Sequence, residues 1–229
     1  MEKFSLSSFS VDDIKEGKIM LVDKPLKWTS FDVVKYIRKS LQLKFKMKKI
    51  KVGHAGTLDP LATGLLIICI GKQTKSISEY QNLSKTYTGK FKLGESTLSY
   101  DAETDVNEKF EFEHITFNDL KNLANEFIGR KMQKPPIFSA IKKDGKRLYE
   151  YARESKEIVI DEREINIYNF EIMDFATPYV DFKIECSKGT YIRSIANDFG
   201  KRLNSGSYLY ELRRTKIGDF CVLNAMDIK

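Results

Sequence analysis

A run of six apolar residues, LLIICI at residues 65–70, constrains the fold of this chain more than any other segment. The run is too short to cross a membrane and lacks polar alternation, which predicts a strand buried on both faces of a sheet. The loop before it, KVGHAGTLDPLATG at residues 51–64, contains several glycines that permit tight turns. Within that loop Pro60 fixes its own φ. The pattern therefore predicts a rigid turn that holds Asp59 beside a buried strand.

Two interpretations of Asp59 follow from the loop. His54 and Thr57 lie nearby in the sequence, so polar groups converge where loops often carry function. Under this interpretation Asp59 is a working carboxylate. Asp-Pro is also a common turn initiator, so Asp59 could serve only to shape the turn before Pro60. The loop taken alone favours the second interpretation.

Length and composition bound the remaining choices. The 229 residues, 41% of them hydrophobic, suit one large domain or one domain with a small insertion. The N-terminal residues contain no apolar stretch typical of a signal peptide, so we expect a cytoplasmic protein. We expect the three widely spaced cysteines, Cys69, Cys186 and Cys221, to be buried reduced thiols. With only two histidines, His54 and His114, we expect no metal site, and we expect no cofactor.

The net charge of +7 and the pI of about 9.1 indicate a polyanionic partner, most simply nucleic acid. Basic residues form three groups: Lys44, Lys46, Lys48, Lys49 and Lys51 before the Asp59 loop, then Lys142, Lys143, Lys146 and Arg147 around an Asp-Gly turn, then Arg202, Arg213, Arg214 and Lys216 near the end. Each group alone is typical of a solvated surface. Three groups in one basic chain favour RNA or DNA binding.

Periodicity predicts a mixed α+β fold without regular βαβ units or a dinucleotide-binding glycine motif. Strands are expected at residues 18–22, 65–70, 85–93 and 180–186, with short late strands at 208–213 and 220–223. Three helices are expected: one capped by Thr29 or Ser30 with Phe31, Val34, Ile37 and Leu41 on one face, one from Thr116 with Leu120, Leu123, Phe127 and Ile128 inside and Gly129 at its end, and one from the turn at 188–190 to Leu203. Residues 131–157 are the expected insertion.

Six segments in order carry a resemblance that covers nearly the whole chain. They are DKPLKWTSFDVV (23–34), GHAGTLDPLATGLL (53–66), KTYTGKFKLG (85–94), PPIFSAIKKDGKRLYEYARE (135–154), GTYIRSIANDFG (189–200) and LRRTKIGDF (212–220). In these segments the chain resembles the TruB family of tRNA pseudouridine-55 synthases. The resemblance implies a single catalytic domain over residues 1–229, with a mixed, largely antiparallel sheet flanked by helices and a small RNA-binding insertion.

The resemblance also implies a reaction. A uridine in the T-loop of tRNA is extruded into a pocket, its C1'–N1 bond breaks, and C5 joins C1'. Asp59 matches the catalytic acid, either as nucleophile or as electrostatic partner of a positively charged sugar. Arg193 matches the arginine that pairs with this aspartate, and Tyr87 matches a tyrosine that stacks on uracil and is a candidate to remove the C5 proton.

Further positions match with weaker independent support. His54 matches a histidine that occupies the space left by the flipped nucleotide, and Leu212 matches a leucine that lines the base pocket. Asp101 and Lys24 match supporting positions near the RNA. Without the resemblance, Arg193 reads as a surface residue, Tyr87 and Leu212 read as core, and His54 reads as a loop histidine bonded to the backbone.

Departures from the family pattern concern loops and the end of the chain. Lys27 and Thr104 stand where many members have glycine. The chain ends soon after LRRT, so we expect no C-terminal RNA-binding (PUA) domain. We therefore predict a monomer in which the catalytic domain and the basic group at Lys142, Lys143, Lys146 and Arg147 make all contacts with the T-arm of tRNA.

Two alternatives to this function are a tRNA-folding chaperone without turnover and a glycoside hydrolase, for which Glu95 or Asp101 would supply a second carboxylate.

Overall fold

The computed structural model describes residues 4–6, 9–154 and 158–228. The chain forms two compact units, one from Met1–Thr88 with Leu212–Lys229 and the other from Gly89–Glu211. We call these unit 1 and unit 2. Two strands, β4 (Lys85–Leu93) and β12 (Ser207–Ile217), have residues in both units. Residues 155–157 of the expected insertion lie outside the described residues.

Unit 1 contains a mixed sheet with the order β14-β1-β3-β12, and β2 also pairs with β3. Strands β1 and β3 are antiparallel, whereas β3 and β12 are parallel. The elements that lie wholly in unit 1 are α1 (Val11–Glu16), β1 (Lys18–Lys24), α2 (Ser30–Phe45), β2 (Val52–His54), β3 (Ala62–Ile70), the 3-10 helix η2 (Gly71–Ser76), α3 (Ile77–Asn82), β13 (Phe220–Cys221), the 3-10 helix η3 (Val222–Asn224) and β14 (Met226–Asp227).

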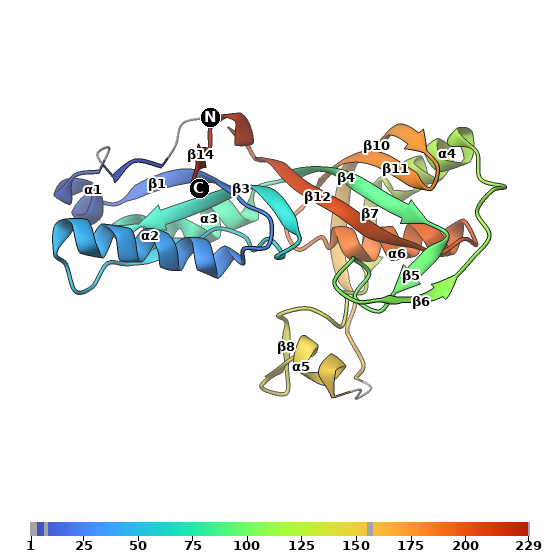
Figure 1. Cartoon of the computed structure of the whole chain (residues 1–229), viewed down its shortest axis with the longest axis horizontal. Coiled ribbons are helices and arrows are strands. Elements are labelled where there is room, and N and C mark those ends of the chain that lie inside the picture. The colour runs from blue at the N-terminus through green and yellow to red at the C-terminus, as the bar shows by residue number, and fades with distance from the viewer. Residues whose placement is uncertain (1–3, 7–8, 155–157, 229) are drawn as a thin grey trace. The chain divides into compact units, whose positions relative to one another are not determined.

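Strand β3 is the centre of unit 1. Leu66, Ile68 and Ile70 belong to a core cluster with residues of α2, which runs alongside β1 and β3 in Figure 1. The alternate residues Leu65 and Ile67 belong to a second cluster, against which side chains of α3 pack. Because side chains alternate along a strand, an apolar residue at every position fills both layers. The prediction of a strand buried on both faces is confirmed.

Helix α2 begins with a capping box in which the side chain of Thr29 accepts from the backbone of Asp32, and the Asp32 carboxylate accepts from the backbone of Thr29. Val34, Ile37 and Leu41 are buried as predicted. The prediction for Phe31 was wrong, because its side chain is 60% exposed. Ser30 faces the interior instead.

Unit 2 contains strands in the order β4-β11-β10-β7, with β10 antiparallel to both β11 and β7. The elements that lie wholly in unit 2 are β5 (Glu95–Thr97), β6 (Val106–Lys109), α4 (Phe117–Phe127), β7 (Gly129–Gln133), β8 (Lys142–Lys143), β9 (Lys146–Arg147), α5 (Leu148–Arg153), β10 (Arg163–Ala176), β11 (Tyr179–Cys186) and α6 (Ile192–Arg202). Helices α4 and α6 contribute rings to an aromatic core that consists of Phe91, Phe127, Phe170, Phe182 and Phe199. The rings of Phe91 and Phe182 stack with centroids 4.2 Å apart.

The fold class, a mixed α+β structure with a largely antiparallel sheet, is confirmed, but several details were wrong. Ile128 is 37% exposed because α4 ends one residue earlier and Ile128 adopts an extended conformation. The expected strand at 220–223 covers only β13, and η3 follows it. Strand β10 was not predicted, since register shifts against β11 interrupt its alternation. Cys221 is partly exposed, unlike the other two cysteines.

Candidate active site

The turn that carries Asp59 is anchored on its N-terminal side by Ser30. The hydroxyl of Ser30 accepts a hydrogen bond from the backbone N–H of Leu58 at 2.8 Å and donates to the Leu58 carbonyl at 3.1 Å. After the aspartate, the N–H of Ala62 donates to the carbonyl of Asp59 at 3.0 Å and closes the turn. Asp59 itself is partly buried. The sequence predicts only a helix-capping role for Ser30, and no local pattern indicates this long-range bond.

The C-terminal side of the turn is anchored through Pro60. The Pro60 carbonyl accepts from the backbone N–H of Lys27 at 2.8 Å and from Nζ of Lys24 at 3.4 Å. Nζ of Lys24 also donates to the carbonyl of Trp28 at 2.6 Å, and this side chain is fully buried. Burial lowers the pKa of Lys24 to about 8, although the negative charge of Asp59 acts in the opposite direction. Lys24 therefore supports the aspartate turn from inside the protein.

Leu212 and Tyr87 also lie in unit 1. Strand pairing sets Leu212 beside Ala62, three residues after Asp59. The ring of Tyr87 is largely buried in β4, and the hydroxyl of Thr215 donates to the carbonyl of its neighbour Thr86 at 3.2 Å. His54 ends β2, where burial is the main cause that lowers its pKa and the charge of Arg214 is the second.

Arg193 and Asp101 form a buried ion pair in unit 2. Nε of Arg193 lies 3.5 Å from a carboxylate oxygen of Asp101, and both side chains are at most 6% exposed. A guanidinium nitrogen of Arg193 also donates to the carbonyls of Phe138 at 2.9 Å and Ser99 at 3.4 Å. The alternative that Arg193 is a surface arginine, which the sequence favours without the resemblance, is thus wrong. The pairing of Arg193 with Asp59 stays a prediction, since the two residues belong to different units.

A local network fixes Asp101. Its carboxylate accepts from the hydroxyl of Ser99 at 2.6 Å and from the backbone N–H of Glu103 at 2.9 Å. Its backbone carbonyl accepts from the hydroxyl of Thr97 at 2.7 Å. Because the carboxylate is held by several donors, it presents a fixed negative charge to Arg193.

The basic group at residues 142–147 forms the β8–β9 hairpin. Asp144 and Gly145, at the turn, both have positive φ, as a tight hairpin turn requires. Two of the four basic residues have carboxylate partners: Lys143 with Asp161 at 3.3 Å, and Lys146 with Glu154. Lys142 and Arg147 are exposed.

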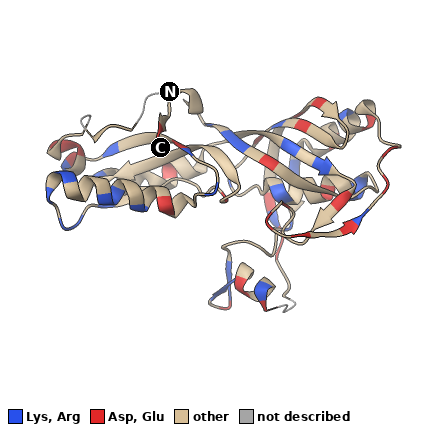
Figure 2. Ribbon diagram, viewed as in Figure 1, with Lys and Arg blue, Asp and Glu red and all other residues tan. Residues whose placement is uncertain are grey.

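The other two basic groups differ in exposure, because all five lysines before the Asp59 loop are exposed, whereas the last group is only partly exposed. Figure 2 shows further basic residues along α2, and the exposed Lys44 near the end of this helix also donates to the backbone carbonyl of Phe9 at 3.0 Å. In the last group Arg213 pairs with Asp23, and Arg214 is only 1% exposed. Arg214 is therefore unsuited to phosphate binding. The prediction that Arg214 adds to the phosphate-binding charge was wrong, because its position in β12 faces the interior.

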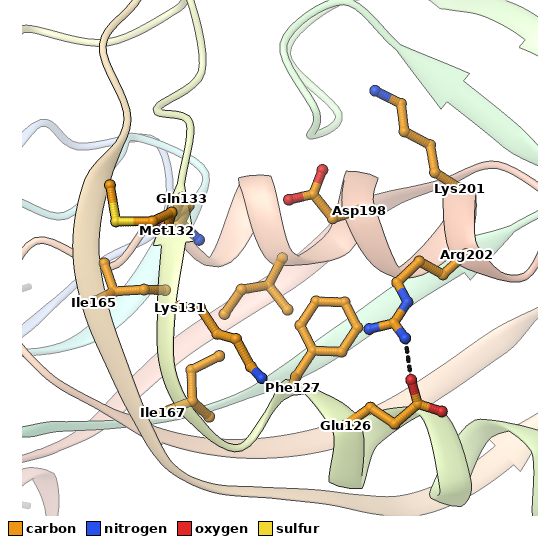
Figure 3. Close-up of a pocket in the computed structure, with 11 residues that line it drawn as sticks. Glu126, Phe127, Lys131, Met132, Gln133, Ile165, Ile167, Asp198, Lys201 and Arg202 are labelled. Carbon is orange, nitrogen blue, oxygen red and sulfur yellow. Dashed lines mark hydrogen bonds and ion pairs between the residues drawn. The ribbon is translucent and has the colours of Figure 1, made fainter.

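The described part of unit 2 also contains cavities. One of about 420 Å³ lies among α4, α6, β7 and β10, with the Arg202–Glu126 ion pair at its edge (Figure 3). Burial raises the pKa of Asp198, which lines it. The residues that line the second, of about 540 Å³, include Leu98, Tyr100 and Ile137, which are sequence neighbours of the partners of Arg193. Neither cavity is lined by a residue that the sequence predicted for the site.

The described residues include no helix that is long and apolar enough to span a membrane. Across the same described ranges, no three His, Cys, Asp or Glu side chains are grouped so that they could hold a metal ion.

The amino-acid sequence matches a known protein family. Residues 39–192 match the model described as TruB family pseudouridylate synthase (N terminal domain). The chain is 56% identical over 218 residues to a protein of Flavobacterium johnsoniae named tRNA pseudouridine synthase B, and the alignment covers 95% of each chain. A protein of the same name from Chloroherpeton thalassium is 52% identical over 211 residues, which cover 92% of this chain and 87% of the relative.

A solved structure with a similar fold is found in a crystal structure of a Cbf5-Nop10-Gar1 complex. The TM-score is 0.68 at 28% sequence identity. The alignment covers 92% of this chain and 51% of that chain, so the present protein spans about half of the length of this neighbour.

Proposed function

This chain belongs to the TruB family of pseudouridine synthases and isomerises uridine to pseudouridine in tRNA, and from that premise we propose that its target is uridine 55 in the T-loop and that Asp59 is the catalytic carboxylate. The observation that carries the proposal is the turn that holds Asp59. It is anchored through Leu58 on one side and through Pro60 on the other. Such double anchoring holds a reacting group in place before the substrate arrives.

The chemistry suits a carboxylate. Cleavage of the C1'–N1 bond leaves positive charge on the sugar, which a nearby anion stabilises or captures as a covalent adduct. The uracil then rotates, C5 bonds to C1', the C5 proton leaves, and N1 gains a proton. Atoms and oxidation state are conserved, so the reaction needs positioning, one anion and one proton acceptor. Asp59 supplies the anion in either version of this mechanism.

The other site residues have complementary proposed roles. The ring of Tyr87 stacks on the extruded uracil, and its hydroxyl removes the C5 proton. Arg193 orients Asp59, in addition to its ion pair with Asp101. Leu212 lines the base pocket, which its pairing with Ala62 beside the Asp59 turn supports. His54 occupies the space that the flipped nucleotide leaves.

We further propose how the protein holds the T-arm. Residues 1–229 act as one catalytic domain, as a monomer in the cytoplasm, and the β8–β9 hairpin with residues 131–157 contacts phosphates. The exposed Lys142 and Arg147 of this hairpin support phosphate contact, since neither is recorded in an ion pair among the described residues.

Tritium release tests the assignment. tRNA transcripts labelled at uridine C5 lose tritium when C5 bonds to C1', so release reports turnover. We expect wild type to release one tritium per target uridine and Asp59→Asn to release none while it binds tRNA within about threefold of wild type. The Asn side chain keeps the shape of the aspartate and removes its charge.

A transcript with cytidine in place of uridine 55 is the matched control for position. Release from this transcript at the wild-type rate would overturn the assignment to position 55. Release by Asp59→Asn would overturn the role of the carboxylate. If wild type bound tRNA tightly but released no tritium, the result would favour a tRNA-folding chaperone without turnover.

A further inference from the structure

Arg214 is a fully buried cation whose guanidinium spans the segment before Asp59. Its Nε donates to the carbonyl of Leu65 at 2.8 Å, one Nη donates to the carbonyl of Gly56 at 3.0 Å, and the other donates to the carbonyl of Thr57 at 3.4 Å. Its side chain is only 1% exposed. The three acceptors lie in the loop and in strand β3, so one side chain ties the loop to the strand that follows it.

The backbone of Arg214 is fixed independently of its side chain. Strand pairing sets Arg214 beside Gly64, and the contact is so close that a Cβ on Gly64 would lie 2.3 Å from the Arg214 carbonyl oxygen. The guanidinium therefore projects from a backbone position that strand pairing holds against Gly64. A planar fork with several fixed donors can hold three carbonyls at once, which a single ammonium group on a flexible stem does less well.

A buried positive charge also acts on its titratable neighbours. After burial, the charge of Arg214 is the next cause that lowers the pKa of His54, and a backbone hydrogen bond at Gly56 acts in the opposite direction. Arg214 also lowers the pKa of Lys24, where Asp59 raises it. The charge of Arg214 thus acts on His54, which lies in the Asp59 loop, and on Lys24, which donates to the Pro60 carbonyl of that loop.

We propose that Arg214 is a positioning residue for the isomerisation, whose guanidinium fixes residues 56–57 between His54 and Asp59. Burial first, and the charge of Arg214 second, favour the neutral imidazole of His54. The positioning of Asp59 rests on the proposed function. A neutral imidazole has one donor and one acceptor nitrogen, so it can meet polar base edges in the loop that a nucleotide has left. A charged imidazole would have donors only.

The test uses two substitutions of Arg214. Arg214→Met removes the charge and all three hydrogen bonds, and Arg214→Lys keeps the charge but lacks the fork. We expect Arg214→Met to lower the single-turnover rate about 100-fold and Arg214→Lys to lower it about tenfold, with the Kd for tRNA within about threefold of wild type in both. Arg38→Met is the matched control, because it removes a guanidinium bond of 2.8 Å to the carbonyl of Val52 in the same unit.

NMR titration measures the pKa of the His54 imidazole, which would not change if Arg214 had only a structural role. The chain contains only His54 and His114, so both signals can be followed in the free protein. We expect the pKa of His54 to rise in Arg214→Met and to remain at the wild-type value in Arg214→Lys. His114 is exposed, and its signal serves as the internal reference in both variants.

Several outcomes would overturn the proposal. A wild-type rate in Arg214→Met, or an equal loss of rate in Arg38→Met, would show that the hydrogen bonds do not position the site. An unchanged His54 titration in folded Arg214→Met would remove the electrostatic role. If that variant does not fold, a wild-type rate in Arg214→Lys contradicts the positioning role. Failure of wild type to form pseudouridine would reject the proposed function, while the His54 titration would still test the charge of Arg214.

Discussion

Gly64 lies directly against the backbone of Arg214, and its φ of +105° is one that other residues rarely adopt. A Cβ at Gly64 would lie 2.3 Å from the carbonyl oxygen and 2.7 Å from the nitrogen of Arg214. Strands β3 and β12 run parallel at this point, with Leu212 beside Ala62. The close approach thus determines the separation of the strand after the Asp59 turn from the strand that carries Leu212.

Gly64→Ala should lower the free energy of unfolding by about 3 kcal/mol or more, because the methyl group forces the two backbones apart and strains the φ angle. Urea unfolding measures the change. Gly145→Ala is the control: Gly145 also has a positive φ, but no atom lies within 4 Å of the added methyl group. We expect that variant to lose only about 1 kcal/mol. Equal losses in the two variants would contradict a steric cause at Gly64.

The buried Asp101–Arg193 pair predicts a strong charge coupling. Asp101→Asn should lower the free energy of unfolding by about 3 kcal/mol, because it removes the Asp101 carboxylate from beside the buried Arg193 charge. The double variant Asp101→Asn with Arg193→Met should recover part of this loss. Urea unfolding of the two single variants and the double variant measures the coupling. Strictly additive losses would show that the pair contributes nothing beyond its separate hydrogen bonds.

Burial of Lys24 predicts a dependence of stability on pH. The pKa of Lys24 is lowered from 10.5 to about 8 in the folded protein, so between these values the unfolded chain binds more protons. Stability from this group therefore rises with pH across that window. Relative to Lys24→Met, wild type should gain about 1.5 kcal/mol between pH 8 and pH 9.5. Urea unfolding at a series of pH values tests this, and a constant difference would contradict it.

The β8–β9 hairpin predicts unequal contributions to RNA binding. Lys142 and Arg147 are exposed, whereas Lys143 and Lys146 have Asp161 and Glu154 as partners. The Lys142→Ala and Arg147→Ala double variant should weaken tRNA binding and reduce the slope of log affinity against log salt by about 2.

The Lys143→Ala and Lys146→Ala double variant is its matched control and should reduce the slope by less than 1. Filter binding at several salt concentrations measures both slopes. If affinity and slope stay unchanged when all four residues are alanine, the hairpin does not contact phosphates.

Local patterns predicted the elements with uninterrupted periodicity. The all-apolar run in β3 and the Thr29 cap of α2 are examples, because each depends on neighbours in the sequence. Strand β10 was missed where register shifts between Ile167 and Asn169 break its alternation. Phe31 was assigned to the wrong face because helical spacing does not identify which residue of the first turn meets the loop.

The sequence by itself determined the strand after Asp59, the glycine-rich turn and the family motifs, because these depend on residues close together in the chain. Tertiary structure decided what holds the turn. Ser30 reaches Leu58, Lys24 reaches Pro60, and Arg214 reaches Gly56 only after distant segments pack together. It also decided that Arg214 is buried while Lys142 is exposed, since both have the same charge and only the fold determines which of them water can reach.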